Sequence, residues 1–234
     1  MQAEIITIGD ELLIGQVVDT NSAWLGRTLG EDGIKVTQIT SIQDDADQIS
    51  RTVNEALARV SIVLVTGGLG PTRDDITKHT LAELFGMRLV RDEQVYETVR
   101  RQLAVRGIAF NELNRGQALV PDGCTVLPNR NGTAPGMWFE RGGGILVSMP
   151  GVPFEMKALV TDEVLPRLRT HFSLHANVHR TATTFGLAES ILAERIAPWE
   201  AALPANLRLA YLPSALCIRL RLSAYETDPE KARS

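Results

Sequence analysis

The stretch VTGGLGPTRDDIT (Val65–Thr77) decides how the rest of this sequence is interpreted. It follows an apolar run, Ile62–Val65, that is typical of a buried strand, and it leads into apolar residues at helical spacing. Glycines between a strand and a helix let backbone N–H groups approach a phosphate, and the helix N-terminus adds partial positive charge. The stretch therefore predicts a phosphate-binding turn. It matches neither common nucleotide motif, because no Gly-Lys-Ser/Thr follows and position 73, an arginine, breaks G-x-G-x-x-G.

Two adjacent carboxylates, Asp74 and Asp75, follow the glycines. Beside a phosphate they would repel it unless a cation intervened. Mg²⁺ suits this position because it binds through one or two carboxylates together with substrate phosphates. The alternative is that Asp74 only caps the next helix, which we expect to begin near this residue, since acids are favoured in a first turn. The turn by itself leaves both interpretations open.

Strands and helices alternate on both sides of this turn. Three short apolar strands are expected at Glu4–Ile8, Ile34–Ile42 and Ile62–Val65, with helices between them. Such an order implies parallel crossovers, and so an α/β fold in which a mostly parallel sheet lies in a three-layer αβα arrangement. A hairpin of Met137–Glu140 and Ile145–Met149 follows, and a helix closes the domain near residue 170.

Three other polar segments accompany the turn: GDELLIGQVVDTN (Gly9–Asn21), NRNGTAPG (Asn129–Gly136) and MPGVPFEM (Met149–Met156). The first and last of these, like the opening stretch, follow an apolar strand. Because the carboxyl ends of parallel strands meet at one edge of a sheet, we expect the segments to form one site. Each also has an ordinary explanation, as a plain turn, a proline-ended strand or a helix cap. The expected helix caps are Asn21 or Ser22 and Asp44 or Asp45.

The sequence pattern changes after residue 170. Strands are expected at Arg180–Phe185, Leu207–Leu212 and Cys217–Tyr225, with a helix at Leu187–Leu203. This is a β-α-β-β unit, and a further helix would begin near Asp228 as the sequence ends. We therefore expect the 234 residues to be part of a longer protein. The predicted domains are residues 1–170 and 171–234.

Composition and charge exclude several classes of protein. The hydrophobic fraction of 44% is ordinary for a globular core, and the net charge of −4, with charges interspersed, favours neither nucleic acid nor an anionic membrane as a partner. The N-terminus does not resemble a signal peptide, and no apolar run approaches the ~20 residues of a membrane span. The two cysteines match no zinc or redox spacing. We expect a cytoplasmic protein.

Four motifs, GDELL, TGGLGPTRDDIT, NGTAPG and PGVPFEM, occur in an order that resembles the N-terminal domain of the CinA family of competence/damage-inducible proteins. The similarity covers roughly residues 3–170, and that domain has the molybdopterin-binding fold shared with MogA, MoaB and MoeA. TFGLAESILAERI and LRLAYLP resemble the KH-like domain that follows in the family. Residues 186–189, GLAE, lack the second glycine of an RNA-binding GXXG loop, which argues against RNA as a partner. A C-terminal amide hydrolase domain acting on nicotinamide mononucleotide is common in the family and is missing from this sequence.

This resemblance implies two activities. One is metal-dependent hydrolysis of ADP-ribose-like dinucleotides to AMP and a sugar phosphate; the other is binding of molybdopterin with transfer or removal of an adenylyl group. The GPTRDD form, PGVPFEM and the KH-like segment favour the hydrolase. A regulatory module that binds a small-molecule nucleotide without hydrolysing it is the non-enzymatic alternative. The resemblance also implies a homodimer and a divalent metal ion, Mg²⁺ or similar, with K⁺ as an additional cation.

The candidate site residues follow from the turn and the resemblance together. Asp74 and Asp75 would hold the divalent ion, and Asp10, Glu11 or Glu155 would place a second ion or act as the base. The candidate catalytic residues are Asp10, Glu11, Asp74 and Asp75. The candidate substrate-binding residues, which would hold the diphosphate and the nucleoside, are Thr66, Gly67, Gly68, Gly70, Pro71, Thr72, Thr77, Asn21, Asn131, Gly132, Thr133, Pro150, Gly151 and Glu155.

Overall fold

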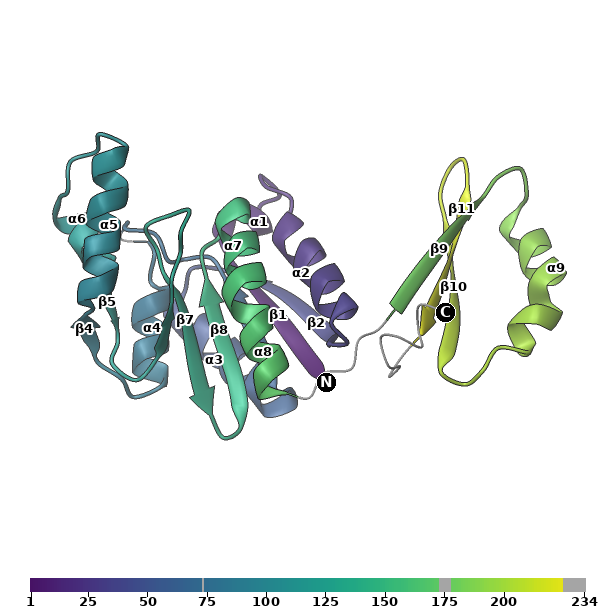
Figure 1. Cartoon of the computed structure of the whole chain (residues 1–234), viewed down its shortest axis with the longest axis horizontal. Coiled ribbons are helices and arrows are strands. Elements are labelled where there is room, and N and C mark those ends of the chain that lie inside the picture. The colour runs from purple at the N-terminus through teal and green to yellow at the C-terminus, as the bar shows by residue number, and fades with distance from the viewer. Residues whose placement is uncertain (73, 173–177, 225–234) are drawn as a thin grey trace. The chain divides into compact units, whose positions relative to one another are not determined.

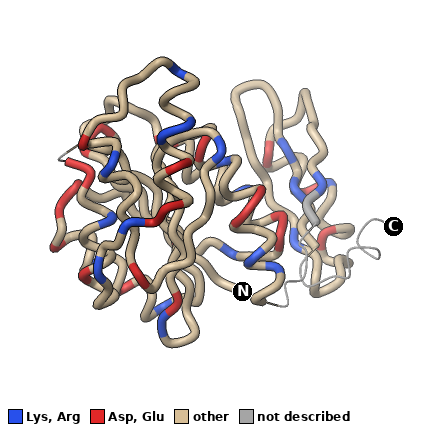
Figure 2. Tube along the Cα trace, turned by 60° about the vertical axis from the view of Figure 1, so that its left-hand side comes forward, with Lys and Arg blue, Asp and Glu red and all other residues tan. Residues whose placement is uncertain are grey.

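The computed structural model describes residues 1–72, 74–172 and 178–224. The chain divides into two compact units. The larger comprises Met1–Gly26 and Lys35–Phe172, and the smaller comprises Arg27–Ile34 and the chain after Phe172. Figure 2 shows acidic and basic residues interspersed along the described chain. Of the helices in these described ranges, none has the length and apolar character that crossing a membrane requires.

A six-stranded sheet forms the centre of the larger unit, in the order β2-β1-β3-β8-β7-β6. Its strands β2, β1, β3 and β8 run parallel, whereas β7 and β6 are antiparallel additions. Every residue of the central strand β3 is buried, as the run of Val, Ile and Leu predicts for a parallel strand covered on both faces. The predicted hairpin is confirmed as β7–β8. The strand bounds are β1 Gln2–Ile8, β2 Lys35–Ile42, β3 Ile62–Thr66, β6 Thr125–Leu127, β7 Gly136–Arg141 and β8 Gly144–Met149.

Helices cover both faces of this sheet (Figure 1). On one face lie α2 (Thr20–Glu31) and a continuous helical run of α7 (Pro153–Leu159), η1 (Val160–Val164) and α8 (Leu165–His171). On the other face, α3 (Ala46–Arg59) and α4 (Thr77–Leu84) pack with inward-facing side chains of β1 and β3 in one buried core. The predicted three-layer α/β fold is therefore confirmed.

A smaller group of elements continues the larger unit between α4 and β6. It consists of the antiparallel pair β4 (Leu89–Arg91) and β5 (Leu119–Pro121) with α5 (Glu93–Val105) and α6 (Glu112–Gly116). The apolar face of α5 packs on β5 in a separate small core that includes Val95, Val99 and Leu103. A short helix α1 (Asp10–Leu13), which the sequence did not predict, directly follows β1.

The smaller unit contains β9 (Val178–Thr184), α9 (Glu189–Ala201), β10 (Leu207–Pro213) and β11 (Ile218–Ala224). The three strands form an antiparallel sheet in the order β10-β11-β9. The predicted β-α-β-β order is confirmed for these elements, and the helix expected near Asp228 lies outside the described residues.

Candidate active site

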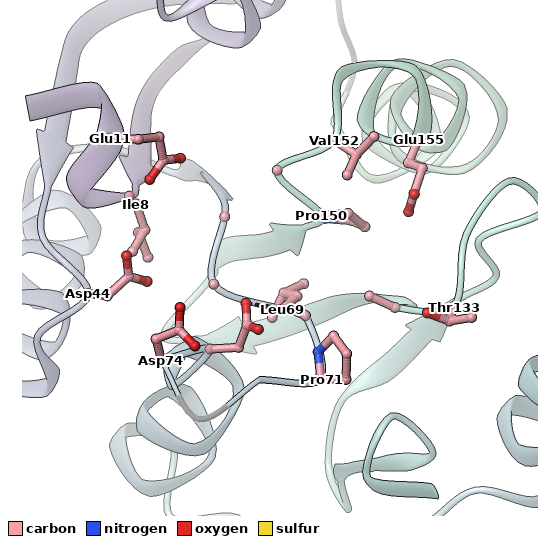
Figure 3. Close-up of a pocket in the computed structure, with 17 residues that line it drawn as sticks. Ile8, Glu11, Asp44, Leu69, Pro71, Asp74, Thr133, Pro150, Val152 and Glu155 are labelled. Carbon is pink, nitrogen blue, oxygen red and sulfur yellow. Dashed lines mark hydrogen bonds between the residues drawn. The ribbon is translucent and has the colours of Figure 1, made fainter. Parts of the chain in front are cut away.

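The glycine turn after β3 opens into a cavity of about 430 Å³ at the carboxyl edge of the parallel strands. Segments that follow β1, β2, β3 and β8 line it, together with Thr133 and Ala134. Thr133 lies on the side opposite Glu11 and Asp44 (Figure 3). The predicted convergence of the polar segments on one edge of the sheet therefore occurs. Parallel strands produce this convergence because all of their carboxyl ends point the same way.

Two of the turn's glycines are required by the backbone itself. Gly67 and Gly68 have φ values of +118° and +63°, which side chains disfavour. A Cβ atom on Gly67 would lie 2.1 Å from the carbonyl oxygen of Ile8, and one on Gly68 would lie 2.1 Å from Thr77 Oγ1. The Gly67 N–H donates to the Met149 carbonyl at 3.1 Å, which ties the turn to the end of β8. The glycines thus allow three chain segments to approach closely beneath the cavity.

Asp75 organises the rest of the turn. Its Oδ1 accepts the Gly70 N–H at 2.7 Å, and its Oδ2 accepts the Thr72 N–H at 2.9 Å and the Thr72 hydroxyl at 2.5 Å. These bonds fold the segment back on itself. Helix α4 begins only at Thr77, and its N-cap residue, Ile76, makes no side-chain hydrogen bond to the helix. The predicted helix start near Asp74 is therefore wrong, and so is the alternative in which Asp74 caps this helix.

Five carboxylate side chains line the cavity: Glu11, Asp44, Asp74, Asp75 and Glu155. Figure 3 shows Glu11 and Asp44 on one side, Asp74 near the turn and Glu155 across from them. Burial raises the pKa of the Asp44 carboxyl, and the negative charges of Asp10, Glu11 and Asp75 raise it further, against a smaller lowering by the Asp10 backbone. A cation in the cavity would relieve this repulsion.

Asp74 has the opposite environment. It is exposed, and hydrogen bonding from the Thr72 side chain and from its own backbone lowers the pKa of its carboxyl. The Thr72 hydroxyl thus lies beside both acids of the pair. Asp74 stays ionised and open to a ligand at neutral pH, whereas both oxygens of Asp75 are engaged by the turn.

Asp44 was not among the predicted site residues. Sequence reasoning treated Asp44 and Asp45 as equivalent helix caps, but the structure separates them. Asp45 caps α3 by accepting the Gln48 N–H at 2.8 Å, which leaves the preceding Asp44 facing the cavity. The sequence did contain a signal that could have identified Asp44. This residue follows β2, and the carboxyl end of β2 lies at the same edge of the sheet as that of β1.

Asn129 builds the opposite wall and was also missed, although it begins the NRNGTAPG segment. It is buried; its Oδ1 accepts the N–H groups of Asn131 and Gly132, each at 3.0 Å. Its Nδ2 donates to Ala134 O at 2.9 Å and to Glu155 Oε2 at 2.7 Å. One amide therefore fixes the loop and orients Glu155 toward the cavity.

The predicted residues divide into a lining set and a supporting set. Those that line the cavity are Glu11, Gly67, Gly68, Gly70, Pro71, Asp74, Asp75, Thr133, Pro150, Gly151 and Glu155. Those that do not line it are Asp10, Asn21, Thr66, Thr72, Thr77, Asn131 and Gly132. Several of the second set hold the first in place: Thr66 Oγ1 donates to Pro150 O at 2.9 Å, and Asn21 Nδ2 donates to Gly151 O at 2.7 Å.

The predicted cap of α2, Asn21 or Ser22, is also wrong, because the helix begins at an earlier residue than the sequence suggested. The carboxylate of Asp19 accepts both the N–H of Ser22, at 2.9 Å, and its hydroxyl, at 2.5 Å, so Asp19 supplies the cap. Asn21 is instead turned toward the loop after β8. The capping residue is the one that directly precedes the helix, and because α2 begins at Thr20, that residue is Asp19.

Within the described part of the chain, no three His, Cys, Asp or Glu side chains are gathered closely enough to hold a metal ion by themselves. The carboxylates of the cavity come from four separate segments of the chain, and they line an open cavity. Such a donor set fits an ion that is shared with a bound phosphate, because Mg²⁺ takes only one or two protein carboxylates in that situation.

Two family models match the sequence. The model of the probable molybdopterin binding domain matches residues 4–170, and that of the damage-inducible protein CinA KH domain matches residues 179–234. A CinA-like protein of Cytophaga hutchinsonii is 50% identical over 232 residues, which are 99% of this chain and 56% of the relative.

The chain belongs to the CinA-like family.

Another CinA-like protein, from Flavobacterium psychrophilum, is 46% identical over 97% of this chain and 55% of its own length. The chain thus spans just over half the length of these CinA-like relatives. The crystal structure of a CinA protein of unknown function from Thermoplasma acidophilum superposes with a TM-score of 0.65 at 34% identity, covering 70% of this chain and 96% of that one. The structure of molybdenum cofactor biosynthesis protein B, at 22% identity and a TM-score of 0.50, covers 73% of this chain and 92% of that one and shares the fold.

Proposed function

We propose that this chain hydrolyses the diphosphate linkage of ADP-ribose-like dinucleotides to AMP and a sugar phosphate, with a divalent metal ion. The observation that carries the proposal is the conjunction of five carboxylates and a glycine turn around one cavity. The carboxylates alone would repel a phosphorylated ligand, and the turn alone would only bind it. Together they suit a phosphate that enters with a cation.

The diphosphate would lie on the turn beside Gly68. The N–H groups of Gly67 and Gly70 already donate to Met149 O and to Asp75, so Gly68 is the glycine of the turn whose N–H has no acceptor among the described residues. The positive φ of Gly68 and the short approach of Thr77 beneath it exclude a larger residue. A Gly68 N–H directed at a phosphoryl oxygen would stabilise charge that grows during the reaction.

Asp74 and Asp44 would hold the divalent ion, with Glu11 beside them. Asp74 is ionised and exposed. Burial and, after it, repulsion from neighbouring acids raise the pKa of Asp44, and a cation would remove the repulsion. When bound, the ion supplies polarisation of a phosphoryl oxygen and offsets charge on the leaving group. Asp75 would act as a positioning residue, because its carboxylate shapes the turn.

Glu155 would be the general base. Asn129 donates to its Oε2, which orients the carboxylate and leaves Oε1 to accept a proton from the attacking water. The water oxygen would form a bond to one phosphorus while the bond from that phosphorus to the bridging oxygen breaks. The bridging oxygen then leaves with the other phosphoryl group, and the water proton passes to Glu155.

A second candidate function has its own support. The family model that matches residues 4–170 is described as a probable molybdopterin binding domain, so an adenylylated pterin is the alternative ligand. Its diphosphate would use the same turn. We place it second because the N-terminal similarity and the KH match together point to CinA-like proteins.

The test is a substrate screen with the purified chain, in which ADP-ribose, FAD and ADP are incubated with EDTA, Mg²⁺ or Mn²⁺ and AMP is read by chromatography. We expect AMP and ribose 5-phosphate from ADP-ribose only when a divalent ion is present. Glu155→Gln should lower the rate at least about tenfold, as loss of a general base does. Asp162→Asn, an exposed acid of η1 that does not line the cavity, is the matched control. Tight ADP-ribose binding without AMP release would instead identify a non-catalytic module.

A further inference from the structure

The glycine turn is contacted by a residue from a distant part of the chain. Gln117 directly follows α6 and is buried, and its Nε2 donates to the carbonyl oxygen of Leu69, in the middle of the turn, at 3.3 Å. Leu69 lines the candidate active site, whereas Gln117 does not. The end of α6 therefore supports the turn from the side away from the cavity.

Gln117 and Asp75 hold the two ends of one peptide group. The Leu69 carbonyl and the Gly70 N–H belong to the same peptide plane; Gln117 donates to the carbonyl, and Asp75 accepts from the N–H at 2.7 Å. Glycine adopts φ values of either sign, so a peptide group that precedes a glycine can turn over when nothing holds it. Because both of its ends are bonded, the Leu69–Gly70 peptide is fixed in one direction.

The direction of this peptide matters for what the turn can bind. Reversal would release the Leu69 carbonyl oxygen from Gln117, and the partial negative charge of a carbonyl oxygen repels a phosphoryl group and attracts a cation. The preceding part of the turn is anchored as well, since the Gly67 N–H donates to Met149 O at 3.1 Å. The Gly68 N–H thus lies between two anchored peptide groups, in a turn that favours an anion.

Gln117 is itself held in place by α4. Lys78 of this helix is buried, and its Nζ donates to the carbonyl oxygen of Gly116, the residue before Gln117, at 2.7 Å. A capping box of Asn111 and Asn114 fixes the start of α6. The turn, the helix that follows it and the end of α6 are therefore connected by hydrogen bonds.

Stability alone is a poor explanation for a glutamine at this position. The Oε1 atom of Gln117 is buried and has no hydrogen-bond partner among the described residues. A buried oxygen without a partner destabilises a folded protein, and an apolar side chain of the same length would avoid this penalty. What glutamine provides here is the donor that reaches Leu69.

We propose that Gln117 is a positioning residue for diphosphate binding: together with Asp75 it fixes the Leu69–Gly70 peptide and keeps the glycine turn in its anion-binding form. The proposal rests on the proposed function for the position of the diphosphate, but not for its hydrolysis. Gln117 acts through the turn and does not touch the ligand.

The experiment compares anion binding with cation binding in Gln117→Met, whose side chain has a similar length and no donor. Inorganic pyrophosphate is titrated by calorimetry with Mg²⁺ present, and Mn²⁺ alone is titrated by electron paramagnetic resonance. We expect the pyrophosphate affinity to fall at least about tenfold, as loss of hydrogen bonding around a charged group does. The Mn²⁺ affinity should stay nearly unchanged, because Asp74 and Asp44 would hold the ion without this peptide. A general loss of the turn would lower both affinities, since the turn also carries Asp74.

Thr37→Val is the matched control. Thr37 Oγ1 also donates to a main-chain carbonyl oxygen, that of Ala3, at 3.2 Å, but it does so at the amino end of β1. This variant should change neither affinity.

An unchanged pyrophosphate affinity in folded Gln117→Met, or an equal loss of Mn²⁺ affinity, would overturn the proposal. Gln117→Leu replaces the first variant if circular dichroism shows that it unfolds. ADP-ribose hydrolysis is assayed in parallel. Pyrophosphate binding that depends on Gln117 without any hydrolysis would remove the proposed function alone. Hydrolysis together with pyrophosphate binding that does not depend on Gln117 would remove the positioning role alone.

Discussion

The Asp75 carboxylate accepts a hydrogen bond from the N–H of Gly70, five residues earlier, at 2.7 Å, so an acid that the sequence suggests as a metal ligand also closes the glycine turn. The same carboxylate receives two bonds from Thr72. The neighbouring Asp74 is hydrogen-bonded by the Thr72 side chain and lies exposed at the cavity. The two adjacent acids therefore have different roles, and their substitutions should separate.

Asp75→Asn should destabilise the protein by about 1.5–3 kcal/mol, because it weakens hydrogen bonds to a charged acceptor. Asp74→Asn should leave the free energy of unfolding nearly unchanged, as is usual for an exposed site, while lowering ADP-ribose hydrolysis at least about tenfold. Urea denaturation and the AMP assay measure the two effects. Equal loss of stability in both variants would contradict the division of roles.

Gly68→Ala should destabilise the protein by at least about 1 kcal/mol, since a side chain at φ +63° is strained and its Cβ would meet Thr77 Oγ1. Gly26→Ala is the matched control, because Gly26 lies inside α2 and no atom of the described residues outside the local helix backbone lies within 4 Å of an added Cβ. That variant should be neutral or stabilised by up to about 1 kcal/mol. Thermal unfolding of both variants measures these effects. A Gly68→Ala protein that is as stable as the wild type would show that the turn has room for a side chain and would contradict the prediction.

Asp44→Asn should stabilise the protein slightly when no metal is added. The pKa of Asp44 is raised in the folded state, so the folded protein binds its proton more readily than the unfolded chain, and the ionised form opposes folding at neutral pH. The carboxyl is only partly buried, which limits the gain to under about 1 kcal/mol. Mg²⁺ or Mn²⁺ should raise the melting temperature of the wild type more than that of the variant. Identical shifts with metal in both proteins would argue against Asp44 as a ligand.

Lys78 predicts a pH dependence of stability. It is buried in α4, its Nζ donates to Gly116 O at 2.7 Å, and burial lowers its pKa to about 8. In the unfolded chain the pKa returns to its ordinary 10.5, so between these values the unfolded state binds more protons and stability from this residue rises with pH. The gain is of the order of 3 kcal/mol at most, from 1.36 kcal/mol per pKa unit.

Lys78→Met should remove this rise. Urea denaturation of both proteins at pH 7, 8, 9 and 10 gives the comparison, with the difference between them as the readout. Burial raises the pKa of Cys124 to about 11, which lowers stability from about pH 9 upward in both proteins and so cancels in that difference. Parallel pH profiles would show that the lysine is not the cause.

Much of the architecture could be predicted from sequence because it depends on local patterns. The buried run of β3 and the alternation of strands and helices fixed a parallel sheet, and such a sheet brings the loops after β1, β3 and β8 to one edge. The turn could be recognised from its glycines. The structure explains why they are there, because Gly67 and Gly68 have positive φ values that favour glycine.

The direction of each carboxylate could not be predicted in the same way. Asp44 and Asp45 are chemically identical neighbours, and so are Asp74 and Asp75. Which acid of the first pair faces the cavity, and which acid of the second pair closes the glycine turn, depends on where α3 and α4 begin. Those starts are set by contacts with residues elsewhere, such as the Asp75 bond to Gly70 and the packing of Thr77 under Gly68. By itself, the sequence determined the sheet, its functional edge and the glycine turn. Only the tertiary structure decided which acids face the cavity, because a one-residue shift in an irregular loop turns a side chain to the opposite side.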